Sequence, residues 1–112
     1  MVKKRFVPAR GDVVWIDLDP TKGHEQQGKR PAVVLSPKSY NQVAGLMLVC
    51  PVTSTKKGYP FETELTAGDI AGVALVDQVR SLDWHARSVK KAGVISEQAV
   101  HEIQQKLQLL LL

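Results

Sequence analysis

The sequence has a single cysteine, few aromatic residues and no long hydrophobic run. One cysteine cannot form an internal disulfide, and because Cys50 lies in an apolar stretch we expect a small buried core residue rather than a catalytic one. No run approaches the roughly 20 apolar residues that cross a bilayer, and no apolar signal core follows the basic residues at positions 3–5. We therefore expect a cytoplasmic protein with no membrane partner.

The motifs of several enzyme classes are also missing. The three histidines, at positions 24, 85 and 101, are far apart, and no cysteine pair or HExxH spacing occurs, so a metal site has no support. The sequence lacks the GxGxxG and GxxxxGK[ST] phosphate-binding loops and the GxSxG nucleophile elbow. We expect neither a metal nor another cofactor.

What is present fits one small globular domain. The 112 residues are enough for one core, and we expect a single domain over residues 1–112. The 15 Lys and Arg residues against 11 Asp and Glu residues give a formal net charge of +4, a moderate excess consistent with a polyanionic partner.

Short runs of β-branched and apolar residues predict strands over most of the chain. The runs cover residues 13–18, 31–36, 46–52, 61–65, 73–79 and 88–94, and in the fourth run Glu62 and Glu64 mark a wet face. Short helical turns are expected at 39–44 and 82–86, and one clear helix after its cap, Ser96. This pattern predicts a mainly β fold: an antiparallel, strongly curved sheet or small barrel with a C-terminal helix packed outside it.

The polar loop GHEQQGKRP, residues 23–31, opens directly onto the second predicted strand. Arg30 lies where loop meets strand, and its planar guanidinium matches two phosphate oxygens. Thr53, at the end of the third strand, offers a hydroxyl to the same phosphate if the two strands are neighbours. The residues alone leave two simpler interpretations open: a surface ion pair for Arg30 and a turn cap for Thr53.

Two further polar residues have alternative interpretations. Glu25 is suited to accept a proton or to read a base edge, or it is a solvated loop carboxylate. Gln78 interrupts an apolar run, and because a buried amide must be hydrogen-bonded it either braces a loop or faces a ligand groove.

The remaining cations and the tryptophans are less informative. Lys56, Lys57, Arg80 and Arg87 either line a path for a nucleic-acid backbone or form a solvated face. We expect Trp15 and Trp84 to be core or packing residues, because the low aromatic content leaves few candidates for a base-stacking platform.

Three stretches together resemble the MazF/PemK-type toxins of bacterial toxin–antitoxin systems, and the MazF branch most closely. They are GDVVWIDLDPTKGHEQQGKRPAVVLSP, CPVTSTKKGYPFE and GVALVDQVRSLDWHAR, and they cover nearly the whole chain. The resemblance implies an SH3-like small barrel, a homodimer, and a sequence-specific, metal-independent endoribonuclease. Such an enzyme cleaves single-stranded RNA, chiefly mRNA, to 2′,3′-cyclic phosphate and 5′-hydroxyl ends, which inhibits translation and growth.

By this resemblance Arg30 and Thr53 match catalytic positions, and Glu25 matches a position tied to activity or RNA recognition. We take Arg30 to stabilise the developing charge, Thr53 to donate a hydrogen bond, and Glu25 to be the general base, with His24 as the second choice. Gln78 and Arg80 match groove positions. The full set expected to bind RNA is His24, Lys29, Lys56, Lys57, Gln78, Arg80 and Arg87.

The resemblance also implies a partner, an antitoxin of the MazE type whose acidic tail covers the basic groove. Two alternatives remain. One is a non-catalytic toxin with the same barrel that poisons a protein such as DNA gyrase, but those relatives use an aromatic C-terminal tail and this chain ends in four leucines. The other is a plain SH3-like binding module, which would need an aromatic-lined groove.

Overall fold

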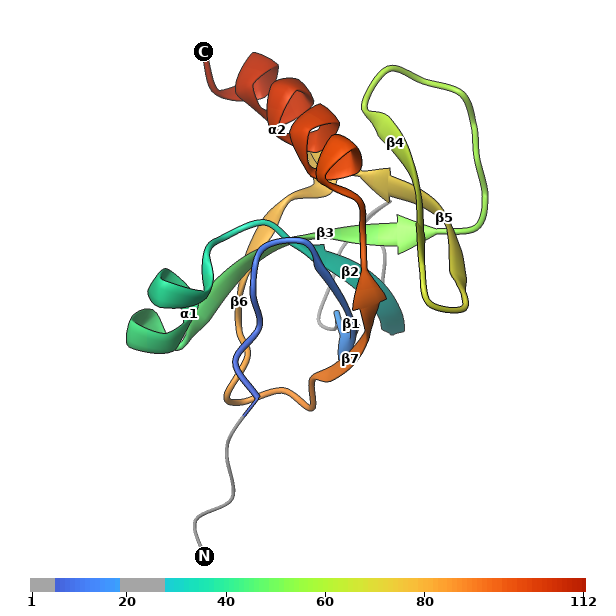
Figure 1. Ribbon diagram of the computed structural model, residues 1–112. Coiled ribbons are helices and arrows are strands. Elements are labelled where there is room, and N and C mark those ends of the chain that lie inside the picture. The colour runs from blue at the N-terminus through green and yellow to red at the C-terminus, as the bar shows by residue number, and fades with distance from the viewer. Residues whose placement is uncertain (1–5, 19–27) are drawn as a thin grey trace, which may run out of the picture.

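The computed structural model describes residues 6–18 and 28–112, which form a strongly curved antiparallel sheet with a helix at its C-terminal end (Figure 1). The strands are β1 (Asp12–Asp17), β2 (Lys29–Val34), β3 (Leu46–Thr53), β4 (Glu62–Ala67), β5 (Ile70–Leu75), β6 (Arg80–Asp83) and β7 (Lys90–Val94). The helices are α1 (Lys38–Ala44), the 3-10 turn η1 (Val76–Gln78) and α2 (Glu97–Leu111). The predicted mainly β fold with a C-terminal helix is confirmed.

Strand β3 organises the sheet, whose order is β4-β5-β3-β2-β1-β7 with β6 also paired to β3. One edge of β3 pairs with β2. The other edge pairs with β6 along Leu46–Val49 and then with β5 at Val52 and Thr53. Strands β5 and β6 therefore pair with two successive parts of the same edge of β3, and η1 connects them.

This arrangement corrects two sequence-based predictions. The single strand expected over 73–79 is divided, because the polar pair Asp77 and Gln78 occupies η1 between β5 and β6. The helical turn expected at 82–86 is wrong, since Leu82 lies in β6. A tight turn follows, in which the Asp83 carboxylate accepts hydrogen bonds from the backbone N–H groups of His85 and Ala86 at 2.9 and 3.0 Å.

The strands carry apolar side chains on both faces, which gives two layers of core. Val13, Val33 and Cys50 belong to the layer under α2, and Val14, Ile16 and Val34 belong to the layer inside the curve of the sheet. Alternation along the strands produces this division. It confirms that Cys50 is a buried core residue, and burial raises the pKa of its thiol to about 12.

The two tryptophans have different environments. Trp84 is buried in the inner layer as predicted, and its indole N–H donates to the carbonyl of Asn41 at 2.9 Å. Trp15 is not a core residue, because 42% of this residue is exposed, and its packing role stays a prediction.

Helix α2 begins at the predicted cap, where the Ser96 hydroxyl accepts a hydrogen bond from the N–H of Ala99 at 3.1 Å. Ile103 anchors it in the core, while the leucines at its C-terminal end remain exposed. Within residues 6–18 and 28–112, no helix has the length and apolar character needed to cross a membrane.

Candidate active site

Arg30 and Thr53 come from the neighbouring strands β2 and β3. The β2–β3 register pairs Val33 with Cys50 and Ala32 with Pro51, and continuing it by two residues sets Arg30 opposite Thr53. Both side chains line one cavity of about 490 Å³. The condition stated for a shared phosphate site, that the two strands lie side by side, is therefore met.

The other walls of this cavity come from the β3–β4 connection and from η1. The connection contributes Thr55, Lys57 and Tyr59, and η1 contributes Asp77 and Gln78. The last residue of β5, Leu75, and the first residue of β4, Glu62, complete the lining. Because η1 follows β5, which pairs with β3 at Val52 and Thr53, its polar residues Asp77 and Gln78 lie at the same end of the sheet as Arg30. The cavity thus combines guanidinium, ammonium, hydroxyl, carboxamide and carboxylate groups.

Thr53 is fixed from two directions. Its hydroxyl oxygen accepts a hydrogen bond from the N–H of Thr55 at 3.2 Å, which leaves the hydroxyl proton to be donated elsewhere. Strand β5 passes so close that a Cβ on Gly72 would lie 2.4 Å from the carbonyl oxygen of Thr53. Glycine at position 72 is therefore required for β5 to pair with this end of β3.

Glu62 holds the β3–β4 connection in place, contrary to the wet position predicted for it. Its carboxylate is buried and accepts backbone hydrogen bonds from Lys57 at 3.0 Å and Gly58 at 2.8 Å. Burial raises the pKa of Glu62, but these two N–H donors and the charge of Lys56 outweigh it and hold the pKa below its ordinary value. Glu64 is exposed, as predicted.

Tyr59 and Asp77 join the loop to η1. The Tyr59 hydroxyl donates to Oδ1 of Asp77 at 2.6 Å. Burial, together with the adjacent Asp77 carboxylate, raises the pKa of Tyr59 to about 12, so the phenol stays protonated at neutral pH. Sequence reasoning missed both residues as parts of the site, although the interruption of an apolar run by Asp77 and Gln78 was a usable signal.

Gln78 lines the cavity but lies in η1 and not in a strand, and it is half-buried. Both interpretations of this amide, a brace for a loop and a group that faces a ligand groove, stay predictions. Lys57 lines the same cavity.

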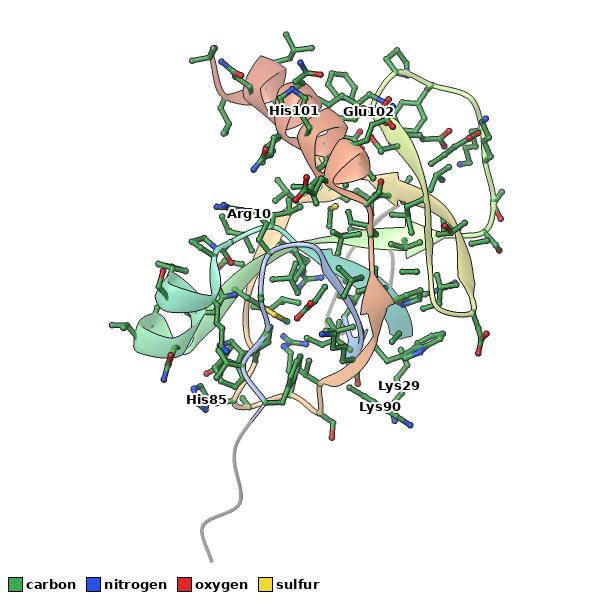
Figure 2. The ribbon with its side chains drawn as sticks, in the orientation of Figure 1. Arg10, Lys29, His85, Lys90, His101 and Glu102 are labelled. Atoms are coloured by element: carbon green, nitrogen blue, oxygen red, sulfur yellow. The ribbon has the colours of Figure 1, made fainter. Side chains whose placement is uncertain are left out.

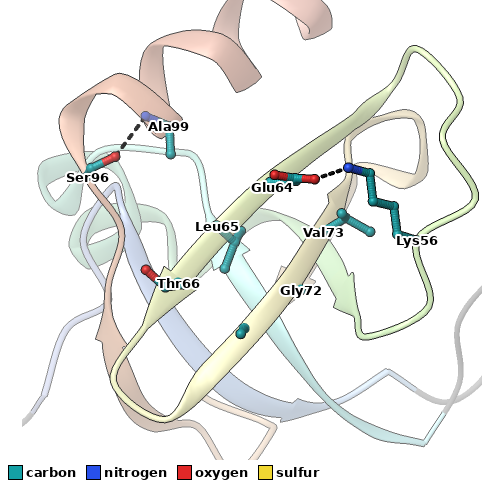
Figure 3. A pocket seen from close by; sticks show the side chains of 9 residues that line it. Lys56, Glu64, Leu65, Thr66, Gly72, Val73, Ser96 and Ala99 are labelled. Carbon is teal, nitrogen blue, oxygen red and sulfur yellow. Dashed lines mark hydrogen bonds and ion pairs between the residues drawn. The ribbon is translucent and has the colours of Figure 1, made fainter.

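Two predicted site residues, Lys56 and Lys29, are not among the residues that line this cavity. Lys56 forms an ion pair with Glu64 beside a second cavity of about 520 Å³, between the β4–β5 hairpin and the start of α2 (Figure 3). Lys29 lines a smaller cavity beside Trp15. His24 and Glu25 lie outside the described residues.

Arg80 and Arg87 both reach the end of β1. Arg80 donates from Nη1 to the carbonyl of Leu18 at 2.9 Å, and Arg87 donates from Nη1 to the carbonyl of Asp17 at 2.5 Å. These contacts fix the point at which the chain leaves β1 toward residues 19–27. Neither arginine is among the residues that line the Arg30 cavity.

A search of the described part of the chain finds no group of three or more His, Cys, Asp or Glu side chains arranged to hold a metal ion. The chemistry that the described cavity itself offers is anion binding by Arg30 and Lys57, hydrogen-bond donation by Thr53, and hydrogen-bond acceptance by the Asp77 carboxylate.

Comparison with known proteins gives a consistent result. The family model described as "PemK-like, MazF-like toxin of type II toxin-antitoxin system" matches residues 9–111. The chain is 49% identical over 107 residues to the endoribonuclease toxin MazF of Escherichia coli K12, covering 96% of each chain, and 43% identical to the endoribonuclease toxin ChpB of the same strain, covering 96% and 97%.

Solved structures agree. The crystal structure of MazF from Deinococcus radiodurans superposes with a TM-score of 0.90 at 48% identity, covering 96% of this chain and 98% of that one. A MazE–MazF structure from the same organism gives a TM-score of 0.83 at 44% identity, covering 96% and 97%.

Proposed function

Because the chain belongs to the PemK-like, MazF-like toxin family of type II toxin–antitoxin systems, we propose that it is an endoribonuclease toxin that cuts single-stranded RNA at the Arg30–Thr53 cavity. The observation that carries this proposal is the convergence of Arg30 and Thr53 from neighbouring strands in one cavity. The relatives that match nearly the whole chain are named endoribonucleases, which favours this function over a toxin that poisons DNA gyrase.

The reaction proposed is a transesterification within the RNA strand. The ribose 2′-oxygen attacks the adjacent phosphorus, the bond from phosphorus to the 5′-oxygen of the next nucleotide breaks, and a 2′,3′-cyclic phosphate and a 5′-hydroxyl remain. The 2′-hydroxyl proton passes to a base, and the leaving 5′-oxygen gains a proton. The attacking group belongs to the substrate, so the protein supplies charge stabilisation and proton transfer.

Arg30 and Thr53 have complementary roles in this scheme. The Arg30 guanidinium donates to the phosphate oxygens, whose negative charge grows as the phosphorane forms. The Thr53 hydroxyl, oriented by the N–H of Thr55, donates to the same group. Lys57 adds a third positive or donor group at the cavity wall.

The reaction needs a general base that accepts the 2′-hydroxyl proton. Glu25 remains our proposal by family resemblance, with His24 as the second choice. The described cavity adds Asp77, whose Oδ1 is already bonded to Tyr59 while its second oxygen is available to a 2′-hydroxyl. A Glu25→Gln protein that keeps its cleavage rate while Asp77→Asn loses it would assign the base to Asp77.

The cations outside the cavity extend the proposed RNA path. Lys29, Arg80 and Arg87 lie near the ends of β1 and β2, close to Arg30 in the fold. Lys56 lies on the far side of the β3–β4 connection, where Glu64 pairs with it. We keep His24, Gln78 and these four residues as the proposed RNA-binding set, with Lys57.

We also propose a cytoplasmic homodimer inhibited by a MazE-type antitoxin. Solved relatives at 44% identity are complexes named MazE–MazF, which supports such a partner. An acidic tail would be attracted to the Arg30 cavity by charge. The exposed leucines at and just after the C-terminal end of α2, Leu109 to Leu112, provide apolar surface that a second subunit would cover.

The test is cleavage of a defined single-stranded RNA in EDTA. Wild-type protein should cut it, and Arg30→Ala should lower kcat/KM at least about tenfold, because a phosphorane charge loses its main donor. Lys38→Ala is the matched control, since Lys38 is an exposed cation on α1 that does not line the cavity. Full activity in the Arg30→Ala protein would refute the assignment.

A further inference from the structure

Trp15 is an exposed aromatic residue in the middle of a strand. It lies on β1, where it pairs with Pro31 of β2 on one side and Lys90 of β7 on the other. Its neighbours Val14 and Ile16 are almost fully buried, whereas 42% of Trp15 is exposed. Successive side chains of a strand point to opposite faces, so the indole projects from the outer face of the sheet.

The indole forms one wall of a small cavity on that face. The cavity measures about 220 Å³ and is lined by Trp15, Ile16, Lys29, Ser88, Val89 and Lys90. This is below the 300–1,000 Å³ typical of sites for whole small molecules, and it suits a single planar ring. Figure 2 shows the two lysines close together and directed away from the sheet.

The charge of this cavity is positive. Its ionisable lining residues are the two lysines Lys29 and Lys90, both exposed, and none of its lining residues is acidic. Asp17, which pairs with Lys29 in register, is the nearest carboxylate along β1. A lysine on an edge strand such as β7 also discourages pairing with another sheet, but that role would not place an exposed indole beside it.

We propose that Trp15 is a base-stacking platform for a nucleotide that flanks the scissile phosphate, with Lys29 and Lys90 bound to the phosphates on either side. Stacking on an aromatic face between backbone-binding cations is how proteins hold single-stranded nucleic acid. This inference rests on the proposed ribonuclease function and adds a binding subsite to it.

The position of the subsite agrees with the cleavage cavity. Lys29 and Arg30 are consecutive residues at the start of β2, and their side chains alternate between the outer face and the cavity. Consecutive Cα atoms are 3.8 Å apart. An RNA strand that extends from the Arg30 cavity over the start of β2 therefore reaches Lys29 first and Trp15 next.

The experiment measures binding and cleavage separately. Binding is followed with 2′-O-methyl RNA, which carries no free 2′-hydroxyl and cannot be cut, and the intrinsic tryptophan fluorescence is the signal. Trp84 is buried and reports the fold, so quenching by RNA reports Trp15. Cleavage of the unmodified RNA by the wild-type protein tests the proposed function independently.

Trp15→Ala should abolish most of the quenching and weaken binding about tenfold, whereas Trp15→Phe, which keeps an aromatic face, should bind within about threefold of wild type. Cleavage by Trp15→Ala should show a raised KM with kcat unchanged at saturating RNA. Val94→Ala, an exposed apolar truncation at the other end of β7, is the control and should change neither.

Several outcomes would overturn the inference. If wild type cuts RNA but Trp15→Ala binds as tightly as Val94→Ala, the subsite is refuted and the ribonuclease function stands. If an acidic peptide quenches Trp15 and RNA does not, the face binds a protein partner instead. If wild type neither cuts nor binds RNA, the proposed function itself fails and the subsite with it.

Discussion

At the scale of single residues, the site depends on side chains whose partners come from other strands. Thr53 is oriented by Thr55 and by the close passage of Gly72, and Arg30 lies opposite it across β2 and β3. The sequence could nominate Arg30 and Thr53, because each marks the end of an apolar run. The sequence could not predict the exposed position of Trp15, because a tryptophan within an apolar strand is expected in the core unless it is known which face of the sheet is covered.

Replacing the Thr53 hydroxyl should impair chemistry without unfolding the protein. Thr53→Val has the same shape and suits a strand, but it cannot donate to the phosphate, so kcat should fall about tenfold or more. Thr53→Ser keeps the hydroxyl and should retain most of the rate. Single-turnover cleavage with circular dichroism as the fold check makes the comparison, and an unimpaired valine variant would remove Thr53 from the mechanism.

At the scale of elements, sequence patterns located most strands and the C-terminal helix, and they failed where polar residues serve tertiary contacts. Asp77 and Gln78 interrupt an apolar run because the chain turns there from β5 to β6. Glu62 breaks the alternation of β4 because its carboxylate binds the N–H groups of the preceding loop. The local sequence pattern predicts neither feature, because each depends on contacts with a segment that is distant in the sequence.

The hydrogen bonds that the Glu62 carboxylate accepts from the β3–β4 connection should make the stability of the protein depend on pH. The pKa of Glu62 is lowered in the folded protein, so its contribution is present above its ordinary pKa of 4.5 and is lost as the pH falls through the lowered value. Glu62→Gln should therefore unfold at lower denaturant concentration at pH 7, and the difference from wild type should shrink in acid.

The control for this prediction is Glu64→Gln. Glu64 is exposed and pairs with Lys56 at the surface, so its loss should have little effect at any pH. Equal denaturation midpoints for wild type and Glu62→Gln at pH 7 would show that the carboxylate does not hold the loop.

At the scale of the whole molecule, the net charge of +4 indicated only a polyanionic partner. Composition could not identify RNA, and the family resemblance carried that step. The structure shows which positive charges lie at the candidate site, because Lys57 lines the Arg30 cavity while Lys56 is paired with Glu64.

Salt dependence tests this placement of charge. Binding of uncleavable single-stranded RNA should weaken as salt rises, and Lys57→Ala should reduce the slope of log K against log salt by about 0.7, the loss of one phosphate contact. Lys38→Ala, which removes the same charge far from the cavity, should leave the slope unchanged. Equal slopes in all three proteins would contradict the proposed path.

In the proposed mechanism the substrate's own 2′-hydroxyl attacks the phosphate held by Arg30 and Thr53. The most direct measurement is cleavage, in EDTA, of two RNAs that differ by a single 2′-deoxy nucleotide on the 5′ side of the mapped cleavage position. We predict that the unmodified RNA is cut there to a 2′,3′-cyclic phosphate and a 5′-hydroxyl, while the deoxy RNA stays intact at that position. Equal cleavage of both RNAs would show that the 2′-hydroxyl is not the attacking group.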